Sequence, residues 1–91
     1  MSQNKNWIYP NIMRDLKKNC EYFLKGNLSV EEIQAYVYIA EQQIVALEER
    51  WLRNMLFNAE NKIEEYRFTV DEEKIRERVI PIITDILKEI S

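Results

Sequence analysis

Carboxylates are the residues of this chain best placed to do chemistry, because sixteen of its 91 residues are Asp or Glu and none is His. Paired acids on one helix face can hold a divalent metal ion, and the common helical signatures place them three residues apart. No two acids here have that spacing, and the pairs four apart include Glu60 with Glu64 and Glu73 with Glu77, which have Lys or Arg close by. These pairs predict a solvated helix surface. We therefore expect neither a metal ion nor another cofactor.

Other kinds of catalytic chemistry lack their usual residues. A single glycine excludes a glycine-rich phosphate loop, and the absence of histidine removes the commonest general base and zinc ligand. Ser29 has no base to activate it, and Cys20 falls on an apolar helix face, where a small buried hydrophobe is expected. The sequence therefore predicts a protein that is not an enzyme.

Two observations predict where the protein works. No apolar stretch is long enough to span a membrane, and the start MSQNKNW lacks the basic-then-apolar order of a signal peptide. A single cysteine cannot form an internal disulfide, which favours a reducing compartment. We expect a cytoplasmic protein without a membrane partner.

Charge is unevenly distributed along the chain, although the net value is only −3. Residues 1–28 carry +3, residues 29–73 carry −7 and residues 74–91 carry +1. Clustered anions argue against direct nucleic-acid binding and favour a basic protein partner. The acids predicted to meet such a partner are Glu60, Glu64, Glu65, Asp71 and Glu72. They form either a plain solvated surface or a patch that imitates phosphates in a cationic cleft.

The first two helices are predicted by their end signals. Pro10 favours a helix that begins just after it, and Gly26 follows the last apolar residue of that helix. Ser29 and Glu32 form a capping box, in which the Ser hydroxyl accepts from the Glu32 amide and the Glu32 carboxylate accepts from the Ser29 amide. The sequence therefore predicts a helical hairpin.

The middle of the chain lacks such signals, because no Gly or Pro stands between Gly26 and Pro81. Apolar residues from Ile33 onward recur at steps of three or four and predict these buried positions: Val37, Ala40, Ile44, Leu47, Trp51, Met55, Ala59, Ile63 and Tyr66. One helix over residues 29–66 would be about 57 Å long, too long for a monomeric domain of this size. We favour a break in the polar stretch 48–54 over one continuous helix.

The last helix is predicted to begin at Thr69 or Asp71 and to continue through Pro81 with a kink, since proline removes one backbone hydrogen bond. Its apolar face is predicted to contain Ile75, Val79, Ile82, Ile83, Ile86, Leu87 and Ile90. No segment alternates convincingly with period two. The fold class is therefore all-α, an antiparallel helical bundle of three to four helices over residues 11–91, after a flexible N-terminal segment at residues 1–10.

The segment from Tyr36 to Leu47 is apolar almost all round a helix. A central helix enclosed by its neighbours would explain this pattern. In the alternative, Tyr38, Val45 and Leu52, which are one heptad apart, form a second stripe that meets another copy of the chain. That alternative predicts a homodimeric helical adaptor or chaperone.

Three segments resemble the colicin D-type immunity proteins. They are FLKGNLSVEE at residues 23–32, LFNAE at residues 56–60 and TVDEEKI at residues 69–75, which leads into the Ile-rich final helix. The resemblance covers about residues 12–90. The chain departs from the family pattern between the second and third helices, where it lacks several residues and any Gly or Pro.

The resemblance implies a small antiparallel four-helix bundle that binds the C-terminal ribonuclease domain of a cognate bacterial toxin. Such a protein plugs the basic cleft that binds tRNA, with carboxylates in place of phosphates. The family's acid after Leu-Phe-x-x-Ala corresponds to Glu60, and its next acid corresponds to Glu65. The immunity protein of a toxin of contact-dependent growth inhibition would look much the same. The first hypothesis is therefore an immunity protein that inhibits a nuclease toxin.

Overall fold

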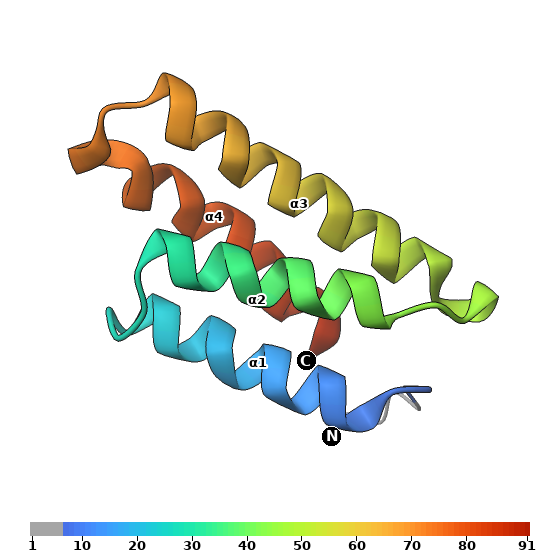
Figure 1. Ribbon diagram of the computed structural model, residues 1–91. Coiled ribbons are helices and arrows are strands. Elements are labelled where there is room, and N and C mark those ends of the chain that lie inside the picture. The colour runs from blue at the N-terminus through green and yellow to red at the C-terminus, as the bar shows by residue number, and fades with distance from the viewer. Residues whose placement is uncertain (1–6) are drawn as a thin grey trace.

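The computed structural model describes residues 7–91, which form four α-helices and one short 3₁₀ helix and contain no strand (Figure 1). The elements are α1 (Pro10–Leu24), α2 (Val30–Gln43), η1 (Leu47–Glu49), α3 (Arg50–Thr69) and α4 (Glu72–Ile90). Consecutive helices run antiparallel and pack side by side, and α4 also packs against α1. The predicted all-α bundle is confirmed, with four helices that close a ring about one core.

The hairpin of α1 and α2 forms as predicted. Gly26 ends α1 with a φ of +87°, a left-handed conformation that favours glycine. The amide of Asn27 donates to the carbonyl of Tyr22 at 2.8 Å, which closes the helix end. In the capping box, Ser29 Oγ accepts from the Glu32 amide at 3.0 Å, and Glu32 Oε1 accepts from the Ser29 amide at 2.8 Å.

The chain breaks between α2 and α3, so one continuous helix over residues 29–66 is wrong. The break lies at residues 44–49, slightly before the predicted stretch 48–54. Spacings counted through this non-helical segment misplace the residues in and next to it, although Ala59 and Ile63 further along α3 are buried as predicted. Leu47 and Trp51, predicted to be buried, are therefore 76% and 48% exposed, whereas Leu52 and Leu56 are fully buried.

The core lies along the axis of the ring and receives apolar side chains from every α-helix. Its fully enclosed members include Phe23 of α1, Ile33 of α2, Leu56 of α3 and Ile83 of α4. Helix α4 continues through Pro81, so the prediction that the helix survives this proline is confirmed. Asp71 precedes α4 at the capping position, although its side chain makes no capping hydrogen bond.

Part of the N-terminal segment, predicted to be flexible over residues 1–10, packs against the bundle. The rings of Trp7 and Trp51 lie 6.0 Å apart, and the Ile8 amide donates to Glu49 Oε2 at 2.8 Å. Tyr9 packs against the core, and Pro10 is the first residue of α1. Residues 7–10 therefore belong to the domain, while residues 1–6 lie outside the described residues.

Candidate protein-binding surface

The contact between α2 and α3, here called the α2–α3 seam, is built around the buried side chain of Gln34, which is 6% exposed. Its Nε2 donates to Glu60 Oε2 at 2.9 Å and to Glu64 Oε1 at 2.6 Å. Its Oε1 accepts from Nη1 of Arg67 at 2.7 Å. One amide thus holds three side chains of α3 and satisfies its own buried polar atoms.

This arrangement brings two of the predicted acids together without cancelling their charge. Glu60 and Glu64 bond to the same neutral amide nitrogen. The cation nearby, Arg67, bonds to the amide oxygen and lies 3.8 Å from Glu31. Two carboxylates therefore stand in fixed positions on the seam, and Glu64 is exposed to solvent.

A second polar contact joins the same two helices further along the seam. Glu41, which is buried on α2, accepts from Nε of Arg53 at 3.1 Å and from Nε2 of Gln42 at 2.8 Å. Here the buried carboxylate has both a cation and an amide for partners. The charge of Glu41 is therefore paired with a cation, unlike the charges of Glu60 and Glu64.

The other predicted acids divide between two places. Glu65 follows Glu64 on α3, and because consecutive residues of an α-helix point about 100° apart, it does not join the carboxylate pair. Asp71 and Glu72 are exposed at the start of α4. Glu72 lines a cleft of about 350 Å³ together with Glu31 and Arg67. The acidic surface therefore consists of Glu31, Glu60, Glu64 and Glu72, with Asp71 beside it.

The second arginine of that cleft, Arg76, contacts the α1–α2 hairpin. Its Nη1 donates to the carbonyl of Leu28 at 2.9 Å, its Nη2 donates to the carbonyl of Phe23, and its guanidinium lies 4.2 Å above the Phe23 ring. These contacts tie the start of α4 to the turn that contains Gly26. Arg76 therefore supports the fold beneath the acidic surface.

The predicted self-association stripe does not form. Tyr38 and Val45 are exposed, but Leu52 is fully buried in the core. The heptad spacing presupposed one helix, and the break at residues 44–49 turns Leu52 inward. The stripe prediction is therefore wrong at Leu52.

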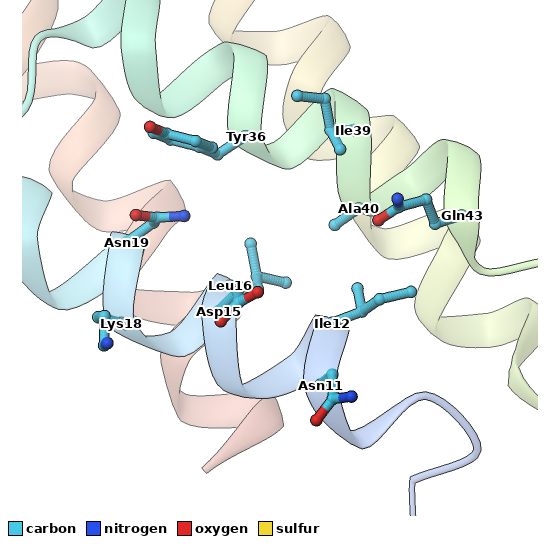
Figure 2. A pocket seen from close by; sticks show the side chains of 10 residues that line it. All are labelled: Asn11, Ile12, Asp15, Leu16, Lys18, Asn19, Tyr36, Ile39, Ala40 and Gln43. Carbon is cyan, nitrogen blue, oxygen red and sulfur yellow. The ribbon is translucent and has the colours of Figure 1, made fainter.

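A groove of about 430 Å³ runs between α1 and α2 (Figure 2). Tyr36, Ile39 and Gln43 line it from α2, and α1 contributes Ile12 and several polar residues. Its charged residues are Asp15, which pairs with Arg14 at 3.5 Å, and Lys18. The groove offers an apolar floor with mixed polar edges and no nucleophile–base pair.

Cys20 carries the one thiol of the chain, and it is buried. Burial raises the pKa of the Cys20 thiol to about 12, with a smaller contribution from the charge of Glu21, so the thiol is protonated at neutral pH. Residues 7–91 contain no group of three or more side chains that could hold a metal ion. None of their helices has the length and apolarity needed to cross a bilayer.

Gln34 is the central residue of the seam and was not among the predicted site residues. Polar residues also stand three positions before it and seven positions after it, at Glu31 and Glu41, so its place on the helix gave no distinct signal. Arg67 likewise gave no signal, because its role depends on a residue 33 positions earlier in the chain. No family model matches the chain, and neither a curated protein nor a solved structure matches it.

Proposed function

We propose that this chain is an immunity protein, which binds the catalytic domain of a cognate nuclease toxin and covers its basic active-site cleft. The observation that supports this most directly is the carboxylate pair of Glu60 and Glu64, which a neutral amide holds in place without neutralising it. Glu72 and Asp71 add further negative charge at the same end of the bundle.

Fixed carboxylates suit the task of imitating phosphates. A cleft that binds RNA contains several Lys or Arg side chains, and its positive field attracts an anionic surface over long distances. A surface whose side chains are already positioned loses little conformational entropy on binding. The hydrogen bonds from Gln34 provide that positioning for two of the acids.

The function is tested by mixing the full chain with two ribonuclease domains: that of a colicin D-type toxin, and that of any toxin encoded beside this chain's gene. We expect a one-to-one complex and loss of tRNA cleavage with the cognate domain. A chain that neither binds nor inhibits these domains would overturn the proposal. A stable dimer in sedimentation equilibrium, with no toxin binding, would instead support the homodimeric adaptor.

A charge variant tests the cleft-covering mechanism separately. Glu64→Gln removes one charge and keeps an oxygen that can accept from Gln34, while Glu48→Gln removes one charge from the opposite end of the bundle. We expect Glu64→Gln to lower the affinity roughly tenfold or more, since truncating one side of a desolvated charge pair is costly. Equal affinities for both variants would contradict binding through this surface.

A further inference from the structure

Two aromatic side chains lie exposed on the α2–α3 seam. Tyr38 of α2 and Phe57 of α3 each expose 50% of their surface. Exposed aromatic residues are enriched at the centres of protein interfaces, where they contribute much of the binding energy. Neither residue belongs to the acidic surface described above.

The cross-helix bonds place both rings between the two polar contacts of the seam. The bonds Gln34–Glu60 and Glu41–Arg53 fix the antiparallel register of the helices. Tyr38 lies four residues after Gln34 and three before Glu41, and Phe57 lies three before Glu60 and four after Arg53. Residues three and four apart share one side of a helix. Tyr38 and Phe57 therefore face each other across the seam, about one helical turn from Glu60.

We infer that Tyr38 and Phe57, together with Glu60 and Glu64, form a site that binds arginine side chains of the partner protein. This inference rests on the proposed function and identifies what the surface recognises. A guanidinium group is planar and can stack on an aromatic ring while it donates to a neighbouring carboxylate. The seam places two exposed rings within about one helical turn of the carboxylates, an arrangement that suits such a group.

The charges of the seam favour a cationic partner over other occupants. Two copies related by a two-fold axis would bring the same patch against itself, and the carboxylates at its edge would repel each other. Nucleic acid would be repelled by the same groups. The seam's own cations are engaged, Arg53 with Glu41 and Arg67 with Gln34. The rings and carboxylates therefore remain available to cations from outside.

Binding kinetics with the cognate toxin domain test the inference. The double variant Tyr38→Ala/Phe57→Ala should raise the dissociation rate about 100-fold, because packed contacts chiefly set how long a complex lasts. Its association rate and the salt dependence of that rate should stay close to those of the wild type. Glu64→Gln should instead slow association and weaken its salt dependence. This division between the two rates separates stacking from charge attraction.

Two further variants serve as controls. Tyr22→Ala removes a partly exposed aromatic from α1, outside the seam, and should leave both rates unchanged. Tyr38→Leu/Phe57→Leu keeps apolar bulk without rings and should still dissociate much faster than the wild type. Circular dichroism of each variant verifies that the bundle is folded.

The outcomes are distinguishable. Wild-type binding with an unchanged dissociation rate in both double variants would overturn the inference and leave the proposed function standing. A wild-type dimer that becomes monomeric in Tyr38→Ala/Phe57→Ala would also overturn it, because the rings would then serve self-association. Failure of the wild type to bind any toxin domain would overturn the proposed function and the inference with it.

Discussion

The backbone amide of Ile8 donates a 2.8 Å hydrogen bond to Oε2 of Glu49, a carboxylate that is only 5% exposed. The other oxygen, Oε1, has no hydrogen-bond partner among the described residues. Glu49 thus joins the segment before α1 to the short helix before α3, 41 positions apart. The tilted ring pair of Trp7 and Trp51 lies alongside this contact.

The Glu49 contact predicts that its loss will destabilise the fold. Glu49→Ala removes the acceptor of the Ile8 amide and should lower the free energy of unfolding by about 1–3 kcal/mol. Glu49→Gln keeps an acceptor oxygen, so it should lower the free energy of unfolding by less. Urea unfolding followed by tryptophan fluorescence measures both. An Ala variant as stable as the wild type would show that the contact is dispensable.

The Gln34 network predicts that different substitutions at this residue lower the free energy of unfolding by different amounts. Gln34→Ala leaves Glu60 and Glu64 without their shared donor and should cost about 1–3 kcal/mol in unfolding free energy. Gln34→Glu should cost more, since it adds a third carboxylate where two already converge. Gln43→Glu, an exposed change on the same helix, is the control and should have little effect. Equal stabilities of the Gln34 variants would contradict the network.

The sequence predicts the α1–α2 hairpin but not the Gln34 network. Gly26 and the Ser29–Glu32 box act within a few residues, so their geometry follows from local chemistry alone. The break before α3 has no Gly or Pro to mark it, and its position decides whether Leu47 or Leu52 is buried. Spacing rules hold only within one helix.

The sequence predicted which residues make the candidate surface acidic, but not how their side chains are arranged. The acidic character of residues 60–72 follows from the sequence. The pairing of Glu60 with Glu64 through Gln34 depends on the register of α2 against α3, which packing of the whole core determines. The separation of Glu65 from that pair likewise required the helix faces to be known.

The backbone conformation of Gly26 predicts that replacing this residue lowers the stability of the fold modestly, through backbone strain alone. A Cβ added there would meet nothing within 4 Å, so Gly26→Ala should lose stability only through the strain of its φ of +87°. We expect a loss of about 1 kcal/mol. Gly26→Asn should lose less, because Asn tolerates this conformation better. Thermal unfolding measures the stability of both variants. An Ala variant more stable than the Asn variant would contradict this prediction.

Cys20 predicts a loss of stability in alkali. The folded chain holds the pKa of this thiol at about 12 against an ordinary value of 9.0, so the unfolded chain releases the proton first. The stabilisation is complete below pH 9 and is lost as pH rises towards 12. Between these limits the thiol should contribute a slope of about −1.4 kcal/mol per pH unit to the unfolding free energy.

The matched control for this slope is Cys20→Ala, which has no thiol and leaves every other side chain in place. Urea unfolding at pH 8, 9 and 10 gives the difference in slope between the two proteins. The wild type should lose stability faster than the variant above pH 9. Parallel pH profiles would show that the thiol does not titrate differently in the two states.

The ring of helices also sets an order of assembly during synthesis. Helix α4 packs against both α1 and α3, and it is translated after them. Until Val79, Ile83 and Ile86 leave the ribosome, the apolar sides of α1 and α3 that face them are exposed to water. The α2–α3 seam, by contrast, is encoded entirely upstream. A nascent chain can therefore form the α2–α3 seam before it can bury its core.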